Sequence, residues 1–140
     1  MKAPMNADTT PMAADLDRER LDVYSGPIIG AAQRVSTWLG SGFLEKVYEN
    51  SLRHELECKG LAVEQQVPVK VFYREQLVGD YVPDLLVERS ILVEIKAISA
   101  LDRIHRQQCI NYLRATGHRV CLLLNFGQSR LQVDRLVWKF

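Results

Sequence analysis

The chain has 140 residues, of which 47% are hydrophobic and 25% charged, and its formal net charge is +1. That length suits one domain with its own core, and the composition excludes a fibrous, disordered or membrane-embedded class. The charge is unevenly distributed, because residues 97–140 contain seven Lys/Arg against two acids, giving +5 there and −4 elsewhere. A basic third beside an acidic site would suit a polyanionic substrate, and an ordinary solvated basic surface is the alternative.

The three cysteines are far apart and show no C-x-x-C spacing: Cys58, Cys109 and Cys121. They are typical of small core residues in a reducing compartment rather than of a disulfide framework or a zinc site. No apolar run approaches the roughly 18 residues that a membrane span needs. Residues 1–17 lack the order of a secretory signal, so a cytoplasmic location and no membrane association are expected.

Residues 1–17 lack periodicity and are expected to form a disordered tail, followed by a single domain over residues 18–140. A first helix is predicted over residues 27–39, with Pro27 in its first turn. A second is predicted over residues 43–59, ending at Gly60. In this second helix Glu45 is expected to lie with the buried face and Glu49 to face water, and a carboxylate on the core side needs a partner.

The middle of the chain changes to a period of two. Residues 67–73, 77–87 and 91–98 are predicted to form an antiparallel meander of three strands. A helix over residues 102–116 follows, then a strand covered on both faces at 119–125 and a half-exposed strand at 131–137. The order ααβββαββ predicts an α/β sandwich in which helices flank a mixed central sheet.

The hairpin from Asp84 to Lys96 contains the most informative residues. Its turn centres on Arg89, so the predicted register sets Asp84 directly opposite Glu94, on the face shared by Leu86 and Leu92. Two facing carboxylates in partly apolar surroundings repel each other, and a divalent cation such as Mg²⁺ or Mn²⁺ is the simplest compensation. Lys96 falls on the same face and can assist a water nucleophile, while the backbone carbonyl of Ile95 is a further candidate ligand.

Pro83-Asp84 followed by Glu94-Ile95-Lys96 resembles the P-D…(D/E)-x-K motif of the PD-(D/E)XK nuclease superfamily. The segment from Gly42 to Tyr48 is similar to G-x-x-E-x-x-Y, which names a family of small proteins in that superfamily. Gln108-Cys-Ile-Asn-Tyr112 resembles the Q-x-x-x-Y motif of its exonuclease-type branch. The similarity runs from about Ile28 to Arg135, and it implies the restriction-endonuclease-like sandwich.

The resemblance implies that Glu45 approaches the hairpin carboxylates and completes or orients the metal site. It also implies that Gln108 and Tyr112, one helical turn apart, lean toward the substrate, and His105 lies close to the same helix face. A basic residue is expected shortly before the hairpin aspartate, where this chain has Tyr81-Val82-Pro83. This departure removes support for a phosphate contact from that strand but leaves the metal site intact.

Two functions are compatible with these residues. The first is a Mg²⁺- or Mn²⁺-dependent nuclease that hydrolyses phosphodiester bonds, with DNA favoured over RNA. The second is a non-cleaving nucleic-acid-binding or accessory module, acting as a homodimer or within a larger complex. The small net charge predicts weak, salt-sensitive binding in either case.

Overall fold

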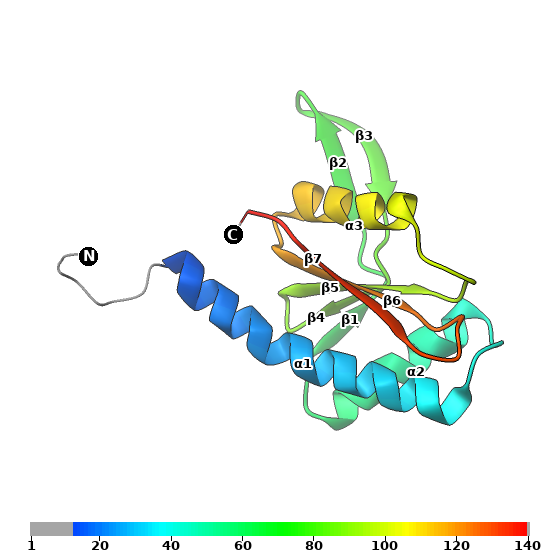
Figure 1. Ribbon diagram of the computed structural model, residues 1–140. Helices are drawn as coiled ribbons and strands as arrows, with labels where there is room; N and C mark the ends of the chain where they lie inside the picture. Colours follow the sequence, from blue (N-terminus) through cyan, green and yellow to red (C-terminus); the bar gives the residue numbers. More distant parts are fainter. Residues whose placement is uncertain (1–12, 140) are drawn as a thin grey trace.

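A five-stranded mixed sheet with helices on both faces forms the body of the protein (Figure 1). The computed structural model describes the backbone of residues 13–139 and the side chains of residues 23–139. The strands lie in the order β1 (Val63–Gln65), β4 (Leu85–Val87), β5 (Ile91–Lys96), β6 (Val120–Asn125) and β7 (Gln132–Val137). Among the described strands, only β5 and β6 pair in parallel. This architecture confirms the predicted α/β class with a flanked mixed sheet.

The sheet separates two hydrophobic cores. On one face α1 (Ala13–Leu39) and α2 (Glu45–Cys58) cover side chains that include Ile91, Val93 and Ile95 of β5. On the other face α3 (Arg103–Thr116) packs on a second cluster that includes Leu86 and Leu92. Because strand side chains alternate, Glu94 and Lys96 share the face of Leu92 and therefore lie on the α3 side.

Helix α1 begins at Ala13 and passes through Pro27, whereas the sequence predicted a helix starting at Pro27. The prediction of a disordered tail over residues 1–17 is therefore wrong for residues 13–17, which are helical. Residues 1–12 lie outside the described part of the chain. Proline removes one backbone hydrogen bond from a helix. The buried stripe that follows it, including Ile28, Ala31 and Ala32, shows that tertiary packing outweighs this local break.

Helix α2 has the predicted extent but a different buried face. Its buried residues are Tyr48, Glu49, Leu52 and Leu56, while Glu45 is exposed. The prediction that Glu45 lies with the core and Glu49 faces water is therefore wrong. The cause is β1, which the sequence reading missed: it lies against α2, and Gln65 at its end and Gln66 directly after it bring their side chains to the Glu49 carboxylate.

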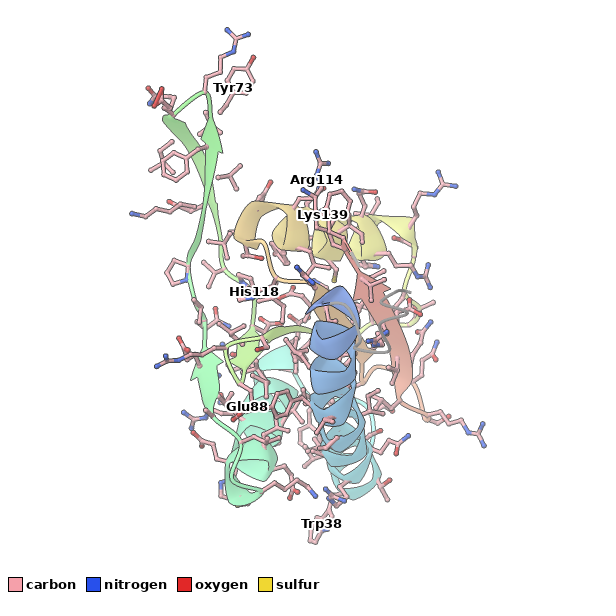
Figure 2. The ribbon with its side chains drawn as sticks, turned by 90° about the vertical axis from the view of Figure 1, so that its left-hand side faces the viewer. Trp38, Tyr73, Glu88, Arg114, His118 and Lys139 are labelled. Atoms are coloured by element: carbon pink, nitrogen blue, oxygen red, sulfur yellow. The ribbon has the colours of Figure 1, made fainter. Side chains whose placement is uncertain are left out.

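The predicted three-stranded meander is also wrong. Residues 77–87 divide between β3 (Gln76–Tyr81) and β4, with Pro83 between them, and proline cannot donate to a strand ladder. Strands β2 (Val69–Tyr73) and β3 form a separate antiparallel ribbon that projects from the body beside α3 (Figures 1 and 2). Positive φ angles at Arg74 (47°) and Glu75 (69°) make its tight turn.

The C-terminal elements follow the prediction closely. Helix α3 and strands β6 and β7 occupy the expected segments, and β6 is buried along its whole length while β7 is half-exposed. Helix α3 runs between the parallel strands β5 and β6, so it forms the crossover connection that a parallel pair requires. Among the described helices, none has the length and apolar character needed to cross a membrane.

Candidate functional site

Asp84 and Glu94 meet at the open end of the β4–β5 hairpin. The ladder pairs Leu85 with Val93, which is the predicted register. Asp84 directly precedes β4, and its backbone N–H donates to Glu94 Oε1 at 2.8 Å. In return, the backbone N–H of Ile95 donates to Asp84 Oδ2 at 2.7 Å. Each carboxylate therefore has one oxygen fixed by the opposite strand, and Asp84 Oδ1 and Glu94 Oε2 remain for other partners.

The two carboxylates are held in surroundings that disfavour their charge. Burial, then the charge of Asp84, raises the pKa of Glu94 to about 8, although the backbone N–H of Asp84 and the charge of Lys96 oppose the shift. Burial also raises the pKa of Asp84 to about 6, with the charges of Glu49 and Glu45 adding to it against the hydrogen bond from Ile95. Such a pair lacks positive charge, which a bound cation would supply.

A third carboxylate, Glu49, lies close enough to act on Asp84 and was not predicted as part of the site. Only 2% of Glu49 is exposed, and its Oε2 accepts hydrogen bonds from Gln65 Nε2 at 2.5 Å and Gln66 Nε2 at 2.9 Å. Lys46 Nζ lies 3.1 Å from the same oxygen. Burial acts to raise the pKa of Glu49, but these hydrogen bonds outweigh it, so the pKa lies below its usual value and the group stays ionised.

Gln66 connects Glu49 to the hairpin. Its side-chain Nε2 also lies 3.3 Å from Asp84 Oδ1, and its backbone N–H donates to the carbonyl of Asp84 at 2.8 Å. The residue has a positive φ of 57°, a backbone conformation that is costly for most residues other than glycine. A glutamine held in this strained backbone, with its amide between two carboxylates, positions Asp84. In the sequence, the signal that could have pointed to this contact was the pair of consecutive glutamines, Gln65 and Gln66, at the end of a short strand.

Lys96 and Ile95 lie where the alternation of β5 predicts. Ile95 is fully buried in the core beneath α1 and α2, and its backbone carbonyl belongs to the strand end that carries the carboxylates. Lys96 is half-buried, and its positive charge acts on Glu94. Among the described residues no acid lies within salt-bridge distance of Lys96. Its ammonium group is therefore available to a substrate.

Glu45 stands at the edge of the site. It is the first residue of α2 and is exposed, yet its charge raises the pKa values of both Asp84 and Glu94. Tyr48 fixes the loop before it, since the hydroxyl donates to the carbonyl of Gly40 at 2.6 Å and accepts from the N–H of Phe43 at 3.2 Å. The tyrosine of the G-x-x-E-x-x-Y segment thus holds the turn that precedes Glu45, and the glycine of the segment, Gly42, has a positive φ of 110° in that turn.

The three residues of α3 that were predicted to contact the substrate lie in different surroundings. Tyr112 is buried on the face toward the site, and burial followed by the charges of Glu94 and Asp84 raises its pKa. Gln108 is half-buried one turn earlier on the same helix. His105 Nδ1 accepts the N–H of Asp102 at 3.0 Å within a capping box, so that nitrogen is engaged in starting the helix.

The segment after β5 is held by Asn125, another residue that the sequence reading did not assign to the site. Its Oδ1 accepts the N–H groups of Ile98 and Gly127, both at 3.0 Å, and its Nδ2 donates to the Ile98 carbonyl at 3.0 Å. Gly127 lies so close to the backbone of Ile98 that a Cβ atom would overlap it. This contact fixes the chain directly beyond Lys96.

The donor set suits a hard divalent cation. Among the described residues there is no group of three or more His, Cys, Asp or Glu side chains arranged to hold a metal ion. The pair Asp84 and Glu94 with a neighbouring backbone carbonyl matches the one or two carboxylates that Mg²⁺ usually takes from a protein. Burial is the main cause of the raised pKa values of both acids, and a bound cation would favour their ionised forms.

Comparison with known proteins agrees with this geometry. A model of the PD-(D/E)XK nuclease superfamily matches residues 22–136, so the chain belongs to that superfamily. The comparison with curated proteins gave no match.

Two solved structures share the fold. The crystal structure of SSO0001 is similar with a TM-score of 0.54 and 16% identity, over 68% of this chain and 50% of that one. An alkaline exonuclease from Laribacter hongkongensis is similar with a TM-score of 0.50 and 14% identity, over 67% of this chain and 56% of that one. This chain therefore matches about half the length of each of these structures.

Proposed function

We propose that this protein is a nuclease that uses Mg²⁺ or Mn²⁺ to hydrolyse phosphodiester bonds, with DNA as the preferred substrate. The observation that carries the proposal is the pair of opposed carboxylates, Asp84 and Glu94, whose pKa values are raised to about 6 and about 8. Membership of the nuclease superfamily supports it. The segment from Gly42 to Tyr48 further supports assignment to the GxxExxY group, and a cytoplasmic location belongs to the same proposal.

In this proposal Asp84, Glu94 and the carbonyl of Ile95 hold the cation, and Glu45 completes or orients the site. When bound, the cation supplies charge stabilisation to the scissile phosphate and acidifies a water nucleophile. Lys96 donates to the phosphate oxygen that gains charge. Gln108 and Tyr112 contact the substrate from α3, and His105 contributes through Nε2, the ring nitrogen outside the capping box.

The test is a calorimetric titration of the protein with Mn²⁺ and Mg²⁺, beside Asp84→Ala and Glu94→Ala. Binding by the wild type that both substitutions abolish is the expected result. Each titration is repeated with a short uncleavable oligonucleotide, because substrate phosphate oxygens complete many magnesium sites. Wild-type protein that binds no cation with or without the oligonucleotide would overturn the proposal.

Cleavage is measured in parallel on labelled single-stranded and duplex DNA and on RNA. Lys96→Ala is expected to abolish cleavage while it preserves cation binding, because the ammonium group is no ligand. Lys59→Ala is the matched control, since Lys59 is exposed at the far end of α2.

The alternative is an accessory module that binds nucleic acid without cutting it, alone, as a homodimer or within a complex. The observation that favours it is that, among the described residues, no group of three or more His, Cys, Asp or Glu side chains is arranged to hold a metal ion, and Glu45 is exposed. Cation binding together with salt-dependent oligonucleotide binding, but no cleavage of any substrate, would support this function instead.

A further inference from the structure

A groove lies between the second half of α1 and the middle of α2. Its volume is about 360 Å³, within the range of roughly 300–1,000 Å³ that is typical of binding sites. Val35 is 5% exposed and Leu39 is half-buried, so apolar side chains form the base of the groove. The walls come from both helices and include Arg34 and Trp38 of α1 with Ser51 and Glu55 of α2.

Trp38 borders this groove without filling it. The residue is 88% exposed and lies at the end of the molecule opposite the ribbon tip (Figure 2). Two further apolar side chains, Leu44 and Val47, are exposed at the start of α2, and Val47 lies one helical turn from Ser51 of the groove wall. A projecting indole beside an apolar hollow costs free energy in water, so this surface is suited to a partner that covers it.

The charges at the groove are balanced and already paired. Arg34 Nε lies 3.3 Å from Glu55 Oε2, and this ion pair joins the two walls. Nucleic acid or an anionic membrane would be held by cations that have no acidic partner, and Arg34 has one. A protein surface with one cation and one anion in the same arrangement fits better, because each charge then meets its opposite.

A second copy of this chain provides such a surface. A two-fold axis along the groove sets α1 of one copy over α2 of the other. Because Arg34 of α1 and Glu55 of α2 lie at the same level of the groove, Arg34 of each copy then lies over the partner's Glu55, and the four charges alternate in sign. The same rotation brings each Trp38 over the groove of the other copy, which has room for an indole ring.

We infer that two copies of this chain associate through their α1–α2 faces, with Trp38 of each copy in the groove of the other. Tryptophan and arginine are enriched among the residues that dominate protein interfaces. The contact uses the same surface on both copies, so it closes on itself and yields a dimer rather than a filament. Since α1 and α2 cover the face of the sheet away from α3, the α3 side of each copy stays open to a substrate.

Sedimentation velocity of the full chain at a series of concentrations is the test. The wild type is expected to form a dimer with a Kd between about 1 and 100 μM, because one groove in each copy makes a small interface. Trp38→Ala is expected to raise this Kd at least about 30-fold, since each dimer loses two buried rings. The exposure of Trp38 means that the substitution should leave the fold intact.

Tyr73→Ala is the matched control, because Tyr73 is 63% exposed at the ribbon tip (Figure 2). This variant should dimerise as the wild type does. A wild type that stays monomeric throughout the series, or a Trp38→Ala variant that dimerises equally well, would overturn the dimer. A monomer whose tryptophan emission is quenched by a single-stranded oligonucleotide, with no quenching in Trp38→Ala, would likewise overturn it and assign the groove to nucleic acid.

A mixing experiment gives a result that misfolding cannot imitate. Arg34→Glu leaves negative charge on both walls of the groove, and Glu55→Arg leaves positive charge on both. Each variant alone is expected to dimerise at least about 10-fold more weakly than the wild type, because like charges face each other. An equal mixture of the two should recover the dimer, since the negative walls of one variant meet the positive walls of the other. A mixture that stays monomeric would contradict this contact.

Arg53 and Glu57 provide the matched control for the mixing experiment. They form a comparable exposed pair on α2, with 4.0 Å between Arg53 Nε and Glu57 Oε1, and neither residue lines the groove. Arg53→Glu and Glu57→Arg should each dimerise like the wild type, alone or mixed. Loss of the dimer in these variants as well would indicate a general effect of charge and overturn the assignment to the groove.

Discussion

Glu94 combines a position in the β4–β5 hairpin with a pKa far from its usual value. The folded protein raises this pKa from 4.5 to about 8, so the folded state binds a proton that the unfolded chain has lost. Stability contributed by the protonated form is present below about pH 4.5 and is lost as pH rises toward about 8. At neutral pH the Glu94 carboxyl therefore lowers the stability of the metal-free fold, as is typical of residues that are kept for binding.

Glu94→Gln is accordingly expected to stabilise the metal-free protein at pH 9, by about 1–3 kcal/mol. The two proteins should have equal stability near pH 4, where the wild-type carboxyl is protonated as well. Urea unfolding in EDTA at the two pH values measures the difference, with Glu64→Gln as an exposed control. A gain of the same size at both pH values would contradict the burial argument.

The strained backbone of Gln66 allows its local cost to be separated from the function of its amide. Gln66→Gly and Gln66→Ala both remove the contact with Glu49 and Asp84, but only glycine accepts a φ of 57° without strain. The glycine variant is expected to be more stable than the alanine variant by about 1 kcal/mol. Both variants should bind Mn²⁺ differently from the wild type in calorimetry, because Asp84 has lost its positioning partner. Equal stabilities of the two variants would show that the backbone is relaxed.

At the scale of the elements, the ends of β5 and β6 are joined by a close backbone contact. Gly127 packs against Ile98, and Asn125 bonds to both, so the chain beyond Lys96 has one path. Gly127→Ala is expected to lower stability by about 2 kcal/mol or more, because the added carbon overlaps backbone atoms that cannot move aside.

The matched control for this change is Gly30→Ala in α1. Gly30 lies in a helix with no atom within 4 Å of an added Cβ, so alanine should raise stability by about 0.4–1 kcal/mol. Thermal unfolding of the two variants is the measurement. Opposite signs are expected, and a small effect at Gly127 would show that β5 and β6 separate easily at this end.

The elements also show what the sequence could predict. The hairpin register followed from one turn and a period of two, so the opposition of Asp84 and Glu94 was correctly predicted. The buried face of α2 was not correctly predicted. A helical stripe that contains Tyr48 can include either Glu45 or Glu49, so the pattern does not decide which carboxylate is buried. Gln65 of β1 and Gln66 directly after it decide between Glu45 and Glu49, and a strand of three residues gives too short a pattern to recognise.

The projecting ribbon was missed for a related reason. Residues 77–87 alternate in the manner of one strand, and Pro83 was the single sign of a break within them. The chain passes from one sheet to the other between β3 and β4, and the packing of the ribbon on α3 that accompanies this change is a tertiary contact. The exposed rings of the ribbon therefore entered the sequence reading as ordinary strand residues rather than as a surface.

For the molecule as a whole, a net charge of +1 means that attraction to nucleic acid must come from local contacts. The slope of a plot of log K against log salt for a single-stranded oligonucleotide changes by about 0.7 for each phosphate that the protein contacts. A shallow slope, of about −1 to −3, is expected, and anisotropy between roughly 50 and 300 mM salt measures it. A slope several times steeper would indicate a large basic footprint.

The carboxylates of Asp84 and Glu94 do more than offer oxygens to a ligand, since each accepts a backbone N–H of the opposite strand and closes the end of the hairpin. A descendant of this protein that had lost its chemistry would still be under pressure to keep a side-chain oxygen at both positions, as an acid or its amide, because any other replacement leaves a backbone N–H without its acceptor. Lys96 carries no such structural duty among the described residues. If the proposed function holds, the loss of Lys96 is therefore a clearer sign of lost chemistry in a related chain than a change of Asp84 or Glu94 to its amide.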